Sequence, residues 1–185
     1  MTIKAFILPT LFLTLAFNNK SDKKIIGKLH SSDNPQFYSV ENIFVILRSD
    51  NKAFDTVRTN DKGEFSAIIP SDKQKNIDIL YSGIGFGTVY LRHIKQLSAD
   101  TTNLQIDLAN NYKKNVFGTA ICPKCSKTNQ VYKIRYGDAP VYTMQVNDNG
   151  DTAYSPIHNG VYEAGTCVSS AQSARWYCKR DKIEF

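Results

Sequence analysis

The sequence predicts an all-β protein, an antiparallel sandwich of seven to eight strands followed by a small cysteine-containing β module. Short runs rich in β-branched and aromatic residues recur at regular spacing, separated by clusters of Gly, Pro, Asn, Asp and Ser. No stretch shows the apolar periodicity of an amphipathic helix. All four cysteines lie in the last 64 of the 185 residues, so the chain suits one sandwich and one smaller module.

Residues 1–22 predict a signal peptide or an N-terminal anchor. Lys4 precedes thirteen uncharged residues, Ala5 to Phe17. A helix of that length spans about 20 Å, less than the ~30 Å hydrocarbon core of a bilayer, and a short apolar run after a lysine is typical of export signals. Ala16 is the one small residue at the expected cleavage position. We therefore expect export to the periplasm or cell envelope, and no transmembrane span in the mature chain.

Residues 23–110 are expected to form the sandwich. Ile25–Leu29 is its first strand, and residues 42–48 carry apolar side chains on both faces, which predicts a central strand covered on both sides. The turn at residues 60–63 ends in a glycine, which can adopt the positive φ that such a turn needs. Further strands are expected at residues 55–59, 64–70, 76–81, 88–93 and 103–108.

The order IIGKL, NIFVIL, TVRTNDKGEFSAIIP and IDILYSGIGF resembles the carboxypeptidase regulatory-like, or transthyretin-like, domain. Thr59 to Phe65 aligns with the Thr-Asp-x-x-Gly-x-Phe turn of that family, with Asn60 in place of the Asp, and Gly85-Phe86 matches its later Gly-Phe pair. The usual Gly-x-Pro turn after the first strand is replaced by Asn34-Pro35. The resemblance covers about 85 residues. It implies a prealbumin-like sandwich that serves as an accessory or binding module and has no catalytic residues of its own.

Two short cysteine motifs mark the tail. Cys122-Pro123-Lys124-Cys125 is typical of the first half of a zinc knuckle, where a tight turn points two thiolates at one ion. The expected second half appears as Cys178-Lys179-Arg180-Asp181, with a carboxylate in place of a thiolate. Aspartate can also ligate zinc, and Cys167 competes with Asp181 for the fourth position.

Residues 116–185, with the segments CPKC, VYKIRYG, GTCVSS and WYCKRDKIEF, resemble a small bacterial zinc-ribbon-like module. Residues 138–163 form a longer insertion than a minimal ribbon needs. Carried over residue by residue, the resemblance implies a structural Zn²⁺ held by Cys122, Cys125, Cys178 and either Cys167 or Asp181.

Disulfides are the competing interpretation, because an exported chain can pair four cysteines in two bonds. A Cys122–Cys125 bond would close a very small, strained loop, whereas Cys167–Cys178 could bridge a hairpin. Redox thiol chemistry would need a helix N-terminus in a βαβ setting, which the sequence does not predict. Sulfurs that share a zinc ion lie about 3.5–4 Å apart, whereas bonded sulfurs lie about 2.05 Å apart.

The net charge of +6 lies at the two ends of the chain. Residues 25–110 carry nine basic and ten acidic groups, and residues 111–185 carry ten basic and six acidic groups. Basic and aromatic side chains lie close together on one expected β ribbon; they are Lys127, Tyr132, Lys133, Arg135 and Tyr136. Such a group occurs in nucleic-acid-binding proteins, but it is also found on an ordinary solvent-exposed strand face.

The remaining motifs predict structure rather than chemistry. Gly83, Gly85 and Gly87 precede a strand, so they predict a turn or bulge rather than a phosphate-binding loop. His30, His93 and His158 lack metal-ligand spacing, no Gly-x-Ser-x-Gly elbow occurs, and residues 147–151 lack the spacing of a calcium loop.

These observations favour a non-enzymatic, exported binding or scaffolding protein of the bacterial cell envelope, with a protein or glycan partner. The alternative is an intracellular zinc-ribbon protein that binds nucleic acid through its basic tail.

Overall fold

The computed structural model describes residues 21–32, 40–108, 112–137, 143–146, 152–164, 169–170 and 172–185. The N-terminal apolar run, Cys167 and residues 147–151 lie outside them, so the predictions made there are untested. No helix among the described residues is long and apolar enough to cross a bilayer. Apart from one short 3₁₀ turn, every regular element among the described residues is a β-strand, which confirms the predicted all-β class.

The elements run in chain order as β1 (Lys23–His30), β2 (Phe44–Ser49), β3 (Lys52–Arg58), β4 (Glu64–Ile69), the 3₁₀ turn η2 (Ser71–Lys73), β5 (Lys75–Gly83), β6 (Phe86–Gln96), β7 (Thr101–Asp107), β8 (Lys113–Lys114), β9 (Ala120–Ile121), β10 (Val131–Arg135), β11 (Thr143–Val146), β12 (Thr152–Ser155), β13 (Ile157–His158), β14 (Val161–Glu163), β15 (Trp176–Cys178) and β16 (Ile183–Glu184).

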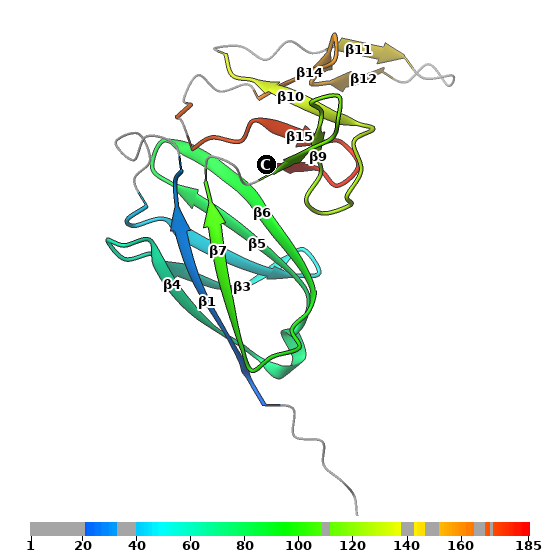
Figure 1. Cartoon of the computed structure of the whole chain (residues 1–185). Helices are drawn as coiled ribbons and strands as arrows, with labels where there is room; N and C mark the ends of the chain where they lie inside the picture. The colour runs from blue at the N-terminus through cyan, green and yellow to red at the C-terminus, as the bar shows by residue number, and fades with distance from the viewer. Residues whose placement is uncertain are drawn as a thin grey trace, which may run out of the picture.

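Strands β1 to β7 form a sandwich of two sheets (Figure 1), one in the order β4-β1-β7 and the other in the order β3-β2-β5-β6. The strand pairs of the four-stranded sheet are antiparallel, as predicted. In the other sheet β1 pairs antiparallel with β4 but parallel with β7, a departure from the predicted antiparallel arrangement. The reason is topological, because the chain leaves β6 in one sheet and crosses to the other, where β7 runs alongside β1.

The sandwich core follows the two-residue alternation of its strands. Inward-facing β4 residues Phe65, Ala67 and Ile69 are buried while their neighbours are exposed. Gly27 on β1 pairs with Phe65, whose ring lies 2.0 Å from where a Cβ on Gly27 would stand. A larger residue at this position would therefore displace the aromatic ring from the core.

The predicted turns have the geometry that their glycines suggested. Gly63 has a φ of +75° and closes the turn before β4. Gly83 pairs with Phe86 beside a shift in register, and Gly85 has a φ of +82°, so this glycine segment forms an irregular β5–β6 turn.

The four-stranded sheet is covered on both faces at its centre. β2 lies between β3 and β5, which confirms that residues 42–48 supply a central strand. On β5 the five consecutive residues 77–81 are all buried, including the charged Asp78. Ile79 belongs to the core between the sheets, whereas Leu80 belongs to a second apolar cluster on the outer face. The residues after β7 form that outer cover.

The C-terminal module is a five-stranded sheet in the order β13-β14-β10-β15-β16, with the small hairpins β8–β9 and β11–β12 beside it. It lies at one end of the sandwich, and the first residues of β1 lie at the other end (Figure 1). The second apolar cluster joins the module to the outer face of the four-stranded sheet, and its buried members are Leu80, Tyr90, Ala120, Cys122, Cys178 and Phe185.

Candidate metal centre

Two tight turns bring the predicted ligands together. Cys122 follows β9, and its backbone closes the first turn: its carbonyl accepts from the Ser126 amide at 2.9 Å, and its amide donates to the Lys127 carbonyl at 3.0 Å. Ser126 has a φ of +58°, which turns the chain sharply after Cys125. The Cys-Pro-Lys-Cys segment thus folds into a compact turn that carries two thiols.

The second turn connects β15 to β16. Cys178 ends β15, where it pairs with Val131 of β10 and with Ile183 of β16. Lys182 adopts a φ of +52° in the turn that leads into β16. Asp181 therefore lies three residues after Cys178 on a short hairpin, close to that thiol.

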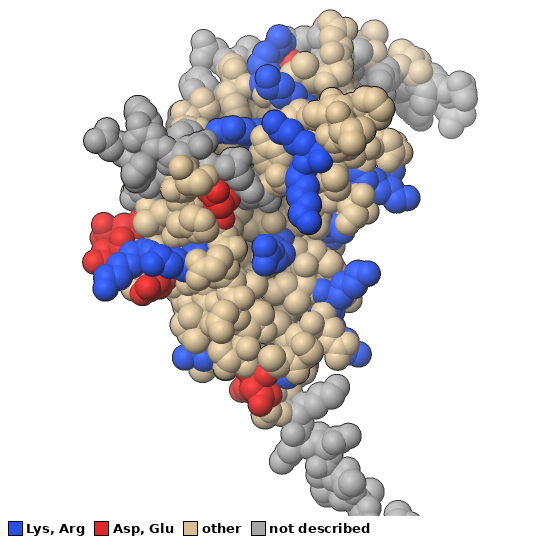
Figure 2. Space-filling model, viewed as in Figure 1, with Lys and Arg blue, Asp and Glu red and all other residues tan. Residues whose placement is uncertain are grey.

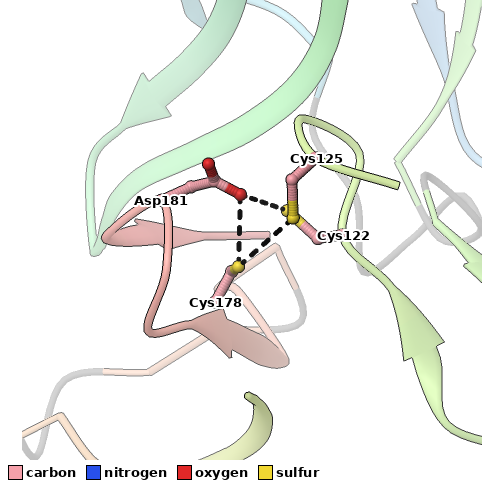
Figure 3. Close-up of side chains that lie close together, drawn as sticks. All are labelled: Cys122, Cys125, Cys178 and Asp181. Atoms are coloured by element: carbon pink, nitrogen blue, oxygen red, sulfur yellow. Dashed lines mark hydrogen bonds between the residues drawn. The ribbon is translucent and has the colours of Figure 1, made fainter. Parts of the chain in front are cut away.

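The four side chains Cys122, Cys125, Cys178 and Asp181 converge (Figure 3), and their ligand atoms all lie within 4.8 Å of one another. Cys125 Sγ is 3.9 Å from Cys178 Sγ, close to the separation of about 3.8 Å for two sulfurs on one tetrahedral zinc ion. Asp181 Oδ2 is 3.1 Å from Cys122 Sγ and 3.3 Å from Cys178 Sγ. This group of three thiols and one carboxylate can hold a metal ion.

Burial keeps two of the thiols protonated when no metal is bound. It raises the pKa of Cys122 and of Cys178, both of which are buried. Burial alone would also raise the pKa of Asp181, but hydrogen bonds from the three thiols outweigh it and lower that pKa below its usual value. A metal would therefore displace thiol protons on binding, while the carboxylate is already charged.

Nearby backbone amides favour the thiolate form of two of the cysteines. The amides of Lys124 and Cys125 act to lower the pKa of Cys122, and the amide of Asp181 acts to lower that of Cys178, although burial outweighs them. The Arg180 guanidinium lies 3.6 Å from Cys125 Sγ. These donors would stabilise negative charge on sulfur, so the surroundings fit a metal-bound thiolate set.

The sandwich forms one wall of the centre. Leu80 and Tyr90, from β5 and β6, are buried in the same cluster as Cys122 and Cys178. Burial, a hydrogen bond to Asp78 and the nearby negative groups all raise the pKa of Tyr90 above its usual range. The phenol is therefore neutral and packs against the cysteines as a mainly apolar wall.

Lys124 connects the cysteine turn to the sandwich by a buried ion pair that sequence reasoning missed. Its Nζ lies 2.8 Å from Asp78 Oδ2 and 3.1 Å from Asn51 Oδ1. Asp78 Oδ1 also accepts from the Tyr90 hydroxyl and lies 2.8 Å from His93 Nδ1. The available signal was an aspartate inside the apolar strand IDILY, because a buried carboxylate needs a charged partner.

The structure therefore brings together Cys122, Cys125, Cys178 and Asp181 from the predicted set. These three cysteines are free thiols, so none of them is in a disulfide. Asp181 stands at the fourth position, while the competing Cys167 lies outside the described residues.

The remaining candidates lie outside this centre. His30 is exposed, His93 partners Asp78, and the side chain of His158 is not among the described ones. On β10 the side chains of Lys133 and Arg135 are exposed while Tyr132 is half-buried, the alternation of an ordinary solvated strand face.

Comparisons with known proteins add no family. No family model and no curated protein matches the sequence. Among solved structures, a 9R-lipoxygenase from Cyanothece PCC8801 is 17% identical at a TM-score of 0.33, with 60% of this chain and 20% of that chain covered. A DUF3823 family protein from Parabacteroides merdae is 13% identical at a TM-score of 0.30, with 46% and 44% covered. The chain thus spans less than half of either protein, and likenesses this weak assign neither fold nor activity.

Proposed function

We propose that Cys122, Cys125, Cys178 and Asp181 hold a structural Zn²⁺ that fixes the C-terminal module to the sandwich of a non-enzymatic binding or scaffolding protein. The convergence of four protein donors within 4.8 Å carries this proposal. Three thiolates favour a thiophilic ion, and a tetrahedral site filled by four protein groups leaves no position for a substrate.

The position of the centre supports a clamping role. Its ligands come from two turns far apart in the sequence, and the wall behind them belongs to β5 and β6 of the sandwich. Lys124, between two ligands, reaches Asp78 of β5. An ion at this point would therefore order both turns of the module and hold Lys124 in place for its contact with the sandwich.

The sandwich supplies the binding surface in this proposal. The outer face of the β4-β1-β7 sheet carries a groove of about 540 Å³, lined among others by Ile26, Arg58 and Asn103. Ile68 on the same face is 63% exposed. An open sheet face of mixed apolar and polar side chains suits a protein or glycan partner. Residues 1–22 are the basis for placing the protein at the cell envelope, after export.

Metal analysis of the purified full chain tests the zinc centre. We expect one zinc per chain by elemental analysis, and an intense thiolate-to-cobalt absorption band when Co²⁺ replaces it. Cys178→Ser should abolish both signals, whereas Cys167→Ser should retain them because Asp181 supplies the fourth ligand. Purified protein with neither bound metal nor free thiols would refute the zinc centre.

Cell fractionation and the mass of the mature chain test the location. We expect the protein in the envelope or periplasmic fraction, and a mass that shows whether the N-terminal segment is removed. A full-length chain found in the cytosol would overturn this part of the proposal and leave the metal result unaffected.

A further inference from the structure

The β8–β9 hairpin presents two apolar side chains to solvent at its tip. Val116 is 94% exposed and Phe117 is 88% exposed. Together they place a branched aliphatic and an aromatic side chain side by side where neither contacts the protein core. Adjacent, fully exposed apolar residues of this size mark an interaction site more often than isolated ones do.

The tip is held in a defined shape. Asn115 Oδ1 accepts hydrogen bonds from the amides of Phe117 and Thr119, at 3.0 and 2.9 Å. The backbone of Asn115 also bonds to Gly118 and Thr119, and Gly118 has a φ of +79°. The backbone therefore holds Val116 and Phe117 outward without support from their own side chains.

Cations surround the base of this hairpin. Lys113 and Lys114 immediately precede the tip and are both exposed. Lys114 also lines a groove of about 420 Å³ together with Lys133 and Arg175, and its described lining residues include no carboxylate. The remaining polar lining includes the hydroxyls of Ser169, Ser170 and Ser173. Figure 2 shows several Lys and Arg side chains on the upper, C-terminal part of the visible face and others on the sandwich, whereas the acidic side chains lie mainly on the sandwich.

We propose that this hairpin and groove form a docking surface for an anionic lipid bilayer, with Val116 and Phe117 inserted into the interface and Lys114 and Lys133 facing the headgroups. The length of the hairpin tip agrees with the depth that interfacial side chains reach in a bilayer. Phe117 lies three residues beyond Lys114, a span of at most about 10 Å, and interfacial side chains reach about 5–10 Å below the headgroups. The lysines would then lie at the level of the lipid phosphates.

The apolar tip favours a membrane over nucleic acid as the partner of this basic surface. A polyanion would use the same cations, but it offers no apolar phase for an exposed valine. A bilayer satisfies both features at once, because its hydrocarbon accepts the tip and its anionic headgroups attract the lysines. This inference names a partner beyond the proposed zinc-clamped scaffold and does not depend on the metal.

Vesicle flotation of the full chain tests the docking surface. We expect the protein to float with phosphatidylcholine vesicles that contain phosphatidylglycerol, and much less with phosphatidylcholine alone. The double variant Val116→Ser with Phe117→Ser should bind at least tenfold more weakly. Ile84→Ser is the matched control, because Ile84 is 99% exposed at the β5–β6 turn but has no lysine beside it in sequence.

Charge variants test the headgroup contacts. Lys114→Gln and Lys133→Gln should each weaken binding about fivefold at low salt. Lys52→Gln and Lys62→Gln remove exposed lysines of the sandwich and should leave vesicle binding unchanged. At the hairpin tip, the variant Phe117→Trp adds a second tryptophan to Trp176. The fluorescence emission that it adds to that of the wild type should shift to shorter wavelength when anionic vesicles are added.

Each variant is also checked for zinc content and melting temperature, so that failure of the metal centre is detected separately.

Several results would overturn the inference. They are failure of the wild type to float with anionic vesicles, equal binding to neutral vesicles, and unchanged binding by the double serine variant. A preference for single-stranded DNA or RNA that weakens in the Lys114 and Lys133 variants would assign the surface to nucleic acid instead.

Discussion

The sandwich and the C-terminal module achieve their order in different ways. The core between the sandwich sheets is continuous, and most of its buried residues come from β1 to β7. Among its described residues the module contributes few fully buried apolar side chains, and two of those are the thiols Cys122 and Cys178. Where the sandwich has aliphatic packing, the module has three cysteines, one aspartate and the outer face of a neighbouring sheet.

This contrast indicates an order of dependence between the two regions. The sandwich buries enough apolar surface to be stable alone, whereas the described part of the module buries so few apolar side chains that we expect it to rely on a cross-link or a metal ion. The module also rests on side chains of β5 and β6, so it depends on the sandwich as well. Loss of the module should therefore spare the sandwich, but loss of the sandwich should not spare the module.

The largest expected effect comes from removing the metal centre. In the double variant Cys122→Ser with Cys178→Ser, the module should unfold while the sandwich keeps its cooperative transition, because structural zinc contributes about 10–16 kcal/mol in small domains. Trp176 is the one tryptophan of the chain and lies in β15, so its fluorescence reports on the module while far-ultraviolet circular dichroism follows the sandwich. Limited proteolysis should then yield a stable fragment that ends after β7.

The Cys167→Ser variant is the control for that experiment. It removes the fourth cysteine of the chain and leaves the residues Cys122, Cys125, Cys178 and Asp181 unchanged. A melting profile and protease pattern that remain those of the wild type in the double variant would contradict a structural role for these cysteines.

A core substitution in the sandwich should come next in size. Ile79 and Leu80 are neighbours on β5 with side chains on opposite faces, one in the core between the sheets and the other under the module. Ile79→Ala should cost about 2–5 kcal/mol and lower the melting of both regions together. Leu80→Ala should loosen mainly the module, detected as earlier loss of the Trp176 signal. Equal effects of both variants on both regions would mean that the chain unfolds as a single unit.

Sequence patterns were sufficient for the sandwich because its strands alternate clearly. Val45 and Leu47 are buried between the sheets as the pattern of residues 42–48 predicts, and Gly63 has the expected positive φ. The parallel β1–β7 pair was not predictable in the same way, because alternation shows which face of a strand is buried but not the direction of its neighbour.

The metal centre was predictable in part, because its motifs are local. Cys122 and Cys125 belong to one motif, and Cys178 and Asp181 to another, so spacing alone identified both pairs. That Asp181 lies beside the three cysteines became clear only once the β15–β16 hairpin was placed in space, whereas Cys167 lies outside the described residues. The contact of Lys124 with Asp78 joins residues 46 positions apart, and no local pattern encodes it.

That ion pair provides the next test of how the two regions are joined. Asp78→Asn leaves Lys124 without its charged partner at a position where only a quarter of the lysine side chain is exposed. We expect a loss of about 2–3 kcal/mol, which is less than the roughly 3–5 kcal/mol for fully buried pairs because Lys124 keeps some contact with water. A double-mutant cycle with Lys124→Met, measured by urea unfolding, isolates the coupling between the two side chains. Zero coupling would mean that the pair does not hold the module.

The same pair should give the interface a dependence on pH. Burial alone would raise the pKa of Asp78, but hydrogen bonds from Lys124, Tyr90 and His93 and the charge of Lys124 lower it below the usual 3.8. The carboxylate therefore stays charged to lower pH in the folded protein than in the unfolded chain. The stabilisation that the Asp78 carboxylate gives to the folded protein is fully present at pH values above 3.8. It is lost as the pH falls below 3.8. The stability difference between wild type and Asp78→Asn should narrow over that range.

The smallest effect on stability should come from the β8–β9 tip. Val116 and Phe117 are almost fully exposed, so replacing both by serine should change the free energy of unfolding by less than about 0.5 kcal/mol. Membrane binding should nevertheless fall sharply in the same variant. This separation is informative because a residue retained for folding would affect stability when replaced, whereas one retained for a partner would affect only binding. A large loss of stability in the double serine variant would place these side chains in the folded core of the module, contrary to their exposure.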